Sequence, residues 1–289
     1  MSPTPEWSTP HWPEGVPHTI SGYEKPLFSV LDDSAREFPD RTYTVFSGAE
    51  RTFAQVKETA DRIADFLASR GLGKGDRVAV FLPNLPHYPP IYFGILKAGC
   101  VCVTCNPLYT AKELNFQLKD CGAKAVFCMD HPQFYPTTVK AIEGTGVSTV
   151  VICGVKSFLP KLKGVLGGLL GKIPKAGSYA PGHLFFDTVV AAAKPRPPQT
   201  AVDPVQDVAL IVYTGGTTGV PKGACLTHSN LAANLAAIDT WMRLVHEPGA
   251  APERQRRGGF HTYLGVLPWY HIFGMTCAML SACASGSRL

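Results

Sequence analysis

The sequence lacks several features that would assign it to a particular class of protein. Its most apolar stretch, residues 91–105, is too short to span a membrane and contains Lys97. The first residues show no basic start followed by an apolar run, so no secretory signal is predicted. The 27 Lys and Arg residues are scattered and, set against 22 Asp and Glu residues, leave a net charge of only +5, which does not favour nucleic acid as a partner. We therefore expect a cytoplasmic protein, and the 45% hydrophobic content predicts a packed interior.

The nine cysteines are not expected to form disulfide bonds, because an intracellular protein keeps its thiols reduced. Cys100, Cys102 and Cys105 lie close together, but they occur in an apolar stretch that is typical of a buried strand. Alternation along a strand would place Cys100 and Cys102 on one face and Cys105 on the other. Since no second pair of ligands accompanies them, no metal site is predicted here.

The chain divides into four parts by composition. Residues 1–22 carry five prolines, which discourage regular structure, and are predicted to form an extended segment. Residues 23–194 alternate between strand-like and helix-like patterns and predict a first α/β subdomain. Residues 195–204 are typical of a proline-rich linker, and residues 205–289 predict the start of a second α/β subdomain. The repeated alternation predicts mostly parallel sheets with helices on both faces.

The segment 158–175 mixes leucines with lysines and has two interpretations. Residues of these kinds can lie on an anionic membrane surface, which would mean peripheral contact with the inner face of the membrane. A short helix that covers the protein's own core is the commoner case, although four glycines weaken a helix here. We favour the second interpretation and keep the first as an alternative.

The most informative stretch is a glycine- and threonine-rich loop that follows the strand-like residues 208–213. Glycine has no Cβ, so backbone N–H groups can approach phosphate oxygens closely. Threonine hydroxyls add donors and a lysine adds positive charge, a combination that suits a nucleoside triphosphate. The predicted nucleotide-binding residues are Tyr213, Thr214, Gly215, Gly216, Thr217, Thr218, Gly219 and Lys222.

Two common phosphate-binding loops do not fit this stretch. A Walker A loop needs glycine before its lysine and serine or threonine after it, whereas Lys222 lies between Pro221 and Gly223. A dinucleotide-binding fingerprint needs a helix after the loop, but residues 224–227 are predicted to form a second strand. The loop is therefore expected to close a hairpin. An ordinary glycine turn is disfavoured, because such a turn needs only one or two special residues.

Residues 213–223 resemble the signature of the adenylate-forming (AMP-binding) superfamily, which includes acyl-CoA synthetases, coumarate ligases and luciferases. Most members have serine where this chain has Gly215, and the Gly-Gly form is similar to the bacterial long-chain fatty acyl-CoA ligases. Residues 83–85 and 106–114 resemble the same subgroup. Residues 267–274 resemble the next core motif of the family, in which the residue at Trp269 is usually less bulky.

This resemblance implies ATP-dependent activation of a fatty acid to an acyl-adenylate, followed by transfer of the acyl group to coenzyme A, with Mg²⁺ near the β- and γ-phosphates of ATP. The threonines and Lys222 would neutralise charge on the leaving pyrophosphate. His271 would lie between the nucleotide and the acyl group, so Lys222 and His271 are the candidate catalytic residues. The candidate acyl pocket comprises Trp269, Tyr270, His271 and Phe273. A structural histidine and core aromatics are the alternatives.

The resemblance also implies that some parts of the family's site are not in these 289 residues. No segment of the Tyr-Gly-x-Thr-Glu type follows residue 274, and the ribose-binding aspartate, its arginine partner and the small C-terminal domain with its lysine are absent. We therefore predict an incomplete N-terminal domain of the acyl-CoA synthetase-like fold, which alone does not make acyl-adenylate at a normal rate. A coumarate-type ligase, a non-catalytic nucleotide-binding protein and a membrane-surface protein remain alternatives.

Overall fold

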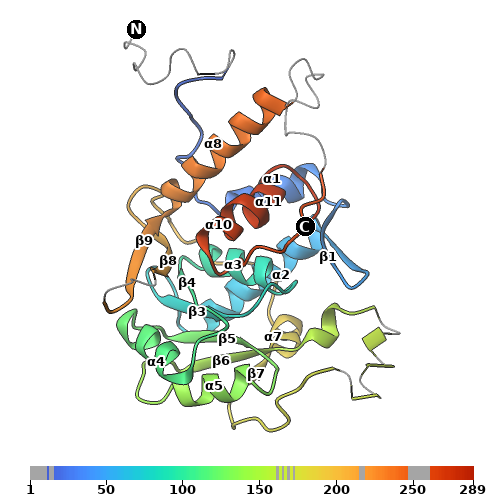
Figure 1. Ribbon diagram of the computed structural model, residues 1–289, viewed down its shortest axis with the longest axis vertical. Coiled ribbons are helices and arrows are strands. Elements are labelled where there is room, and N and C mark those ends of the chain that lie inside the picture. Colours follow the sequence, from blue (N-terminus) through green and yellow to red (C-terminus); the bar gives the residue numbers. More distant parts are fainter. Residues whose placement is uncertain are drawn as a thin grey trace.

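A sheet of seven strands with helices on both sides forms the body of the protein (Figure 1). The computed structural model describes residue 12 and residues 16–160, 163–164, 166–167, 170–171, 173–214, 219–246 and 261–289. The strands are β1 (Thr42–Phe46), β2 (Ala49–Thr52), β3 (Arg77–Phe81), β4 (Val101–Thr104), β5 (Ala125–Met129), β6 (Thr149–Cys153), β7 (Leu184–Phe185), β8 (Val208–Thr214) and β9 (Lys222–Thr227). The helices are α1 (Ser29–Glu37), α2 (Phe53–Ser69), α3 (Tyr88–Lys97), α4 (Ala111–Asp120), α5 (Phe134–Ala141), the 3₁₀ turn η2 (Val155–Phe158), α7 (Phe186–Ala192), α8 (His228–His246), α10 (Ile272–Gly274), the π-helix η3 (Met275–Leu280) and α11 (Ser281–Ala284).

The central sheet has the order β7-β6-β5-β3-β4-β8-β9. Its neighbouring strands from β7 to β8 are parallel, while β9 runs antiparallel to β8 as the second arm of a hairpin. β1 and β2 form a separate antiparallel pair. The predictions of a mostly parallel sheet and of a hairpin around the glycine-rich loop are both confirmed.

Helices α2 and α4 begin where the sequence provides a capping box. The Thr52 hydroxyl accepts from the Gln55 N–H, and the Gln55 side chain accepts from the Thr52 N–H. Thr110 and Glu113 make the same reciprocal pair at the start of α4. These contacts satisfy N–H groups that have no partner inside the helix, which is why local sequence alone fixes these two starts.

The sheet separates two apolar cores because successive strand residues point to opposite faces. The larger core lies under α1, α2, α3 and the C-terminal helices, and the smaller one lies under α4 and α5. Cys100 and Cys102 belong to the larger core and Cys105 to the smaller, as the alternation predicts. Burial raises the pKa of the Cys100 thiol to about 12.

The residues on both sides of the predicted linker 195–204 contribute to the same sheet. β8 follows this stretch and pairs with β4, with Cys102 opposite Leu210 and Thr104 opposite Val212. Within the described residues, the stretch therefore connects strands of one sheet and does not separate two sheets. Parallel pairing with β4 satisfies the backbone groups along one side of β8, which an isolated second unit would leave at an edge.

The segment with the two interpretations is described only in part. It starts at the end of η2, and residues 161–162, 165, 168–169 and 172 lie outside the described residues, as do residues 1–11 and 13–15 of the predicted extended segment. Neither interpretation of residues 158–175 is therefore tested. In the part of the chain that the structure describes, no helix is both long and apolar enough to cross a membrane.

Candidate functional site

The carboxyl ends of β3 and β4 form a point where the chain winding changes direction. These strands are adjacent and parallel, yet α3 follows β3 into the larger core and α4 follows β4 into the smaller core. Connections that leave two neighbouring strands toward opposite faces open a crevice between them, and ligands of α/β sheets bind in such crevices. The next strand, β8, ends beside this point and leads directly into the glycine-rich loop.

The two arms of the β8–β9 hairpin hold both ends of this loop. Thr214 lies opposite Lys222 in the register of the two strands, and the Thr214 hydroxyl donates to the Lys222 backbone oxygen at 3.4 Å. Lys222 is exposed, and no ion pair of its side chain is found among the described residues. Residues Gly215, Gly216, Thr217 and Thr218, which complete the predicted loop, lie outside the described residues. Gly219 is exposed on the return arm.

Tyr213 anchors the hairpin to α4. Its hydroxyl donates to Asp120 Oδ2 at 2.5 Å, across 93 residues of sequence. Burial raises the pKa of the Tyr213 phenol, and the hydrogen bond to the Asp120 carboxylate raises it further. The phenol therefore stays protonated as a donor, and this contact favours a role for Tyr213 in holding the hairpin.

A cavity of about 520 Å³ lies between the hairpin and α4. Its lining combines aromatic residues and a proline with polar and charged residues: Tyr109, Thr110, Lys112, Glu113, Phe116, Gln117, Tyr213 and Pro221. The Gln117 side chain is buried and donates to the Thr104 oxygen at 2.8 Å, while its own carbonyl oxygen has no partner among the described residues.

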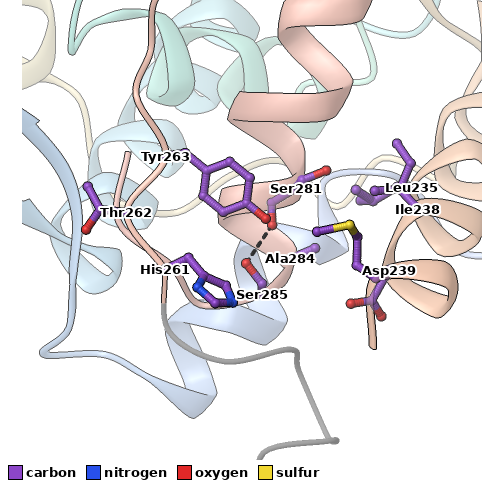
Figure 2. A pocket seen from close by; sticks show the side chains of 10 residues that line it. Leu235, Ile238, Asp239, His261, Thr262, Tyr263, Ser281, Ala284 and Ser285 are labelled. Carbon is purple, nitrogen blue, oxygen red and sulfur yellow. Dashed lines mark hydrogen bonds between the residues drawn. The ribbon is translucent and has the colours of Figure 1, made fainter. Parts of the chain in front are cut away.

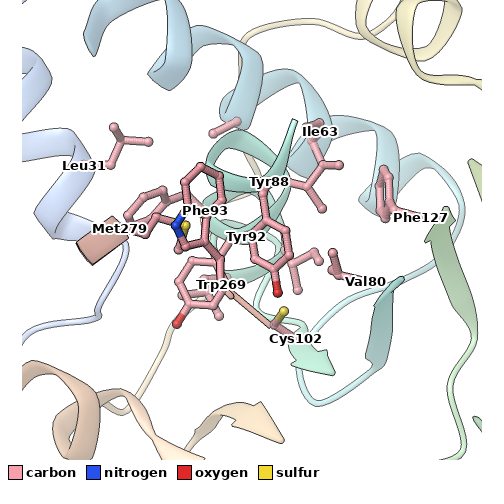
Figure 3. Packing of buried hydrophobic residues seen from close by; sticks show 14 of the residues in the cluster. Leu31, Ile63, Val80, Tyr88, Tyr92, Phe93, Cys102, Phe127, Trp269 and Met279 are labelled. Atoms are coloured by element: carbon pink, nitrogen blue, oxygen red, sulfur yellow. The ribbon is translucent and has the colours of Figure 1, made fainter. Parts of the chain in front are cut away.

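The residues predicted for the acyl pocket do not share one environment. Trp269 is only 6% exposed, and its ring lies 6.0 Å from that of Tyr88 at an angle of 73°, beside Tyr92 and Cys102 (Figure 3). Phe273 is 55% exposed, and Tyr270 is half-buried. In this arrangement Trp269 is part of the core, whereas Phe273 is available to a ligand.

His271 is exposed and caps the short helix α10. Its ring nitrogen Nδ1 accepts from the Phe273 backbone N–H at 3.3 Å, and the His271 backbone N–H donates to the Pro268 backbone oxygen at 3.2 Å. The ring nitrogen on the far side, Nε2, remains available for a ligand, since Nδ1 faces the backbone.

An apolar cavity of about 490 Å³ begins at Phe273. It lies between α8 and the π-helix η3 and is lined by Leu226, Asn230, Leu231, Asn234, Ile238, Ile272, Phe273, Thr276 and Cys277. A π-helix is rare and often occurs at functional sites, because its wider turn displaces side chains from their usual positions. The geometry therefore offers room for an apolar ligand group next to His271.

Another cavity, of about 420 Å³, lies farther along α8 and is lined by Leu235, Ile238, Asp239, Met242, His261, Thr262, Tyr263, Ser281, Ala284 and Ser285 (Figure 2). The Tyr263 hydroxyl is hydrogen-bonded to the Ser285 side chain inside it. No sequence pattern had indicated this cavity, because its walls come from separate segments.

Sequence reasoning also gave no role to Asn84. Its side chain makes three hydrogen bonds to the backbone of Gly265, Leu267 and Trp269. Asn84 lies in residues 83–85, which resemble the long-chain subgroup, but that resemblance gave no partner for its side chain, and its contacts about 180 residues away were not predictable from local pattern. Among the described residues, no group of three or more His, Cys, Asp or Glu side chains could hold a metal ion.

A doubly wound sheet with a glycine-rich hairpin at the carboxyl ends of its strands is typical of nucleotide-binding α/β proteins. The chain belongs to the AMP-binding enzyme family, whose model matches residues 31–289. It is 36% identical over 278 residues to the long-chain-fatty-acid–CoA ligase of Bacillus subtilis, covering 93% of this chain and 46% of that protein. The corresponding ligase of Salmonella typhimurium is 34% identical over 274 residues, covering 92% of this chain and 46% of that protein.

Solved structures show the same fold. The apo structure of MbtA from Mycobacterium smegmatis matches with a TM-score of 0.72 and 28% identity, over 92% of this chain and 44% of that one. A long-chain-fatty-acid-CoA ligase from Archaeoglobus fulgidus matches with a TM-score of 0.68 and 24% identity, over 93% of this chain and 47% of that one. The chain spans about half the length of the curated relatives it matches. The resemblance inferred from residues 213–223 and 267–274 is thus confirmed at the level of the family.

Proposed function

We propose that this chain is part of an enzyme that activates a long-chain fatty acid with ATP and then transfers the acyl group to coenzyme A. The fatty-acid carboxylate would attack the α-phosphorus of ATP, forming an acyl-adenylate and releasing pyrophosphate. The thiol of coenzyme A would then attack the acyl carbon and displace AMP. The observation that carries the proposal is the β8–β9 hairpin, which opens at the carboxyl end of β8 next to the crevice between β3 and β4.

The residues of the hairpin fit a triphosphate. Lys222 and Thr214 face each other across the ends of the loop, so a cation and a hydroxyl flank the backbone that would wrap the β- and γ-phosphates. A charge-assisted hydrogen bond from lysine to phosphate is stronger than one between neutral groups, and it would oppose the charge that grows on the leaving pyrophosphate. Mg²⁺ prefers phosphate and water oxygens, and it would be carried in with the nucleotide and add positive charge there.

The apolar cavity that begins at Phe273 fits a hydrocarbon chain. Most of its lining side chains are apolar, and Ile272, which directly follows His271, is among them. A carboxylate held near His271 could extend its chain along α8, where each buried methylene adds roughly 0.8 kcal/mol. Under this proposal His271 lies at the junction of nucleotide and acyl group, while Trp269 supports the wall from inside the core.

Binding of ATP·Mg²⁺ to residues 1–289 tests the role of the hairpin. We expect Lys222→Ala to weaken ATP·Mg²⁺ binding roughly 10- to 100-fold, because hydrogen bonds to charged groups are worth about 1.5–3 kcal/mol. Lys140→Ala is the matched control, since Lys140 is an exposed lysine in the last turn of α5. Equal affinities for wild type, Lys222→Ala and Lys140→Ala would contradict the proposal.

Pyrophosphate exchange driven by an acid tests the reaction and its substrate class. The assay uses the protein encoded by the whole reading frame that contains these 289 residues, with palmitate, benzoate and coumarate as acids. Exchange driven by palmitate is the expected result, because the cavity at Phe273 is mainly apolar. Exchange driven only by the aromatic acids would replace the fatty acid with an aryl substrate, and no exchange with any acid would reject the activity.

A further inference from the structure

Asn84 joins two segments of the candidate site that are about 180 residues apart in the sequence. Its Nδ2 donates to the backbone oxygens of Gly265 at 2.9 Å and Leu267 at 2.8 Å. Its Oδ1 accepts from the Trp269 N–H at 2.8 Å. Two acceptors and one donor on the loop match the two N–H donors and the carbonyl of one amide, so the geometry also fixes the orientation of the side chain.

The loop that receives these bonds has little burial of its own. Leu264 is 82% exposed and Val266 is 70% exposed, so these side chains contribute almost no apolar burial. Within the described residues, we find no other side chain that hydrogen-bonds to the backbone of residues 264–270. The position of the loop therefore depends on Asn84 and on Trp269, which enters the core.

Two glycines mark the places where the loop is closely packed. A Cβ on Gly265 would lie 2.9 Å from Trp269 Cζ2, and a Cβ on Gly274 would lie 2.2 Å from the Pro268 oxygen. Gly265 thus lies against the indole ring, and Pro268 lies against Gly274 at the end of α10. A shift at these two contacts would displace the residues that follow the loop.

His271 is the next residue in that path. Its N–H donates to the Pro268 oxygen at 3.2 Å, and its oxygen accepts from the Met275 N–H at 3.0 Å. Movement of the 264–268 backbone would therefore be transmitted to His271 and to the helix behind it. The β8–β9 hairpin has a separate attachment, since β8 pairs with β4 and Tyr213 bonds to Asp120.

We propose that Asn84 is a positioning residue that fixes the 265–269 backbone and thereby holds His271 in place for acid activation. Asn84 does not itself touch the reactants, and this inference rests on the function proposed above. A displacement of about 1 Å in a positioned group can lower a rate roughly 100-fold. Loss of this clamp, the three hydrogen bonds of the Asn84 side chain, should therefore impair the step that involves the acid and leave nucleotide binding by the glycine-rich loop intact.

The test compares Asn84→Ala with Asn115→Ala, which removes a similar side chain elsewhere. Asn115 Nδ2 also donates to two backbone oxygens, those of Ala141 at 2.7 Å and Glu143 at 2.9 Å, but it lies in α4 over the other core. In palmitate-driven pyrophosphate exchange, we expect Asn84→Ala to lower kcat/KM for the acid roughly 10- to 100-fold. The KM for ATP should change less than about twofold, and Asn115→Ala should leave both parameters near wild type.

Asn84→Asp provides a readout that a merely structural role would not give. A carboxylate keeps the acceptor for the Trp269 N–H but places negative charge against two carbonyl oxygens, so activity should fall at neutral pH. A protonated carboxyl donates one hydrogen bond, and activity relative to wild type should therefore recover as the pH is lowered. A constant ratio of the two activities across pH would overturn the charge argument and the proposal with it.

Hydrogen exchange at the Trp269 amide in residues 1–289 tests the clamp without catalysis. This amide should exchange at least about tenfold faster in Asn84→Ala, because its acceptor is gone. An unchanged hydrogen-exchange rate at the Trp269 amide, or equal losses of turnover in Asn84→Ala and Asn115→Ala, would overturn the positioning role. A wild-type protein with no acid-driven exchange would instead reject the proposed function, and the amide result would then describe a purely structural contact.

Discussion

Gly94 in α3 gives a prediction in which two opposing effects can be compared. A Cβ at this position would lie 2.7 Å from Ile63 Cβ and Cγ2 and 2.8 Å from the Ala60 oxygen, all in α2. Alanine is preferred over glycine inside a helix by about 1 kcal/mol, so an open position would gain stability from Gly→Ala. Here the neighbours are a branched side chain close to its backbone and a backbone oxygen. Neither can rotate away, so the two helices must separate.

The structure sets the size of the effect. Ordinary contacts of a Cβ begin at 3.4 Å, so the 2.7 Å contacts must lengthen by about 0.7 Å. Overpacking of this kind costs about 1–3 kcal/mol, and we take the upper end because backbone atoms are involved. After the gain of about 1 kcal/mol in helix propensity, Gly94→Ala should destabilise the protein by about 2 kcal/mol.

Urea unfolding of residues 1–289, followed by far-ultraviolet circular dichroism, measures this difference. Gly73→Ala is the control, because nothing lies within 4 Å of a Cβ there. Its stability should stay within about 0.5 kcal/mol of wild type. Gly94→Ala with unchanged or increased stability would refute the reasoning about the α2–α3 contact.

Two further predictions concern buried titratable side chains. The Lys97 side chain is 3% exposed and forms an ion pair with Asp61 at 2.5 Å, so Lys97→Met should lower the free energy of unfolding in urea by about 3 kcal/mol. Lys57→Met is the control at a lysine that is 37% exposed, and it should cost under about 1 kcal/mol. Equal losses in the two variants would contradict the burial argument. Burial lowers the pKa of His228 to about 4 and that of His87 to about 3. Between pH 6.5 and 4 the unfolded chain therefore binds protons that the folded chain does not. The free energy of unfolding should decrease by roughly 1 kcal/mol for each histidine per pH unit as the pH is lowered. His228→Gln and His87→Leu should each flatten this slope in unfolding measured from pH 7 to 5, and an unchanged slope would show that the histidines do not cause it.

Local signals in the sequence set some of the element boundaries that the structure shows. The capping boxes at Thr52 and Thr110 fixed the starts of α2 and α4, because both partners lie within four residues of each other. Gly71 follows α2 and Gly122 follows α4, and their φ values of +74° and +61° are ones at which a side chain would be strained. Alternation along 100–105 placed the cysteines on opposite faces for a similarly local reason.

The family was also recognisable from the sequence, since the glycine- and threonine-rich loop has a composition that few other loops share. Residues 213–223 carried this recognition. The roles of Lys222 and His271 remain predictions. Binding and exchange assays on their variants are the direct tests.

The sequence by itself determined where α2 and α4 begin, which of the clustered cysteines face which core, and the family to which the chain belongs. Only the tertiary structure decided that β8 pairs with β4, that Trp269 enters the core while Phe273 stays exposed, and that Asn84 holds the loop at Gly265. Periodicity and capping depend on neighbours within a few residues, so they are visible in the sequence. Partners about 100 to 180 residues away are chosen by the packing of the whole sheet, and no local pattern records that choice.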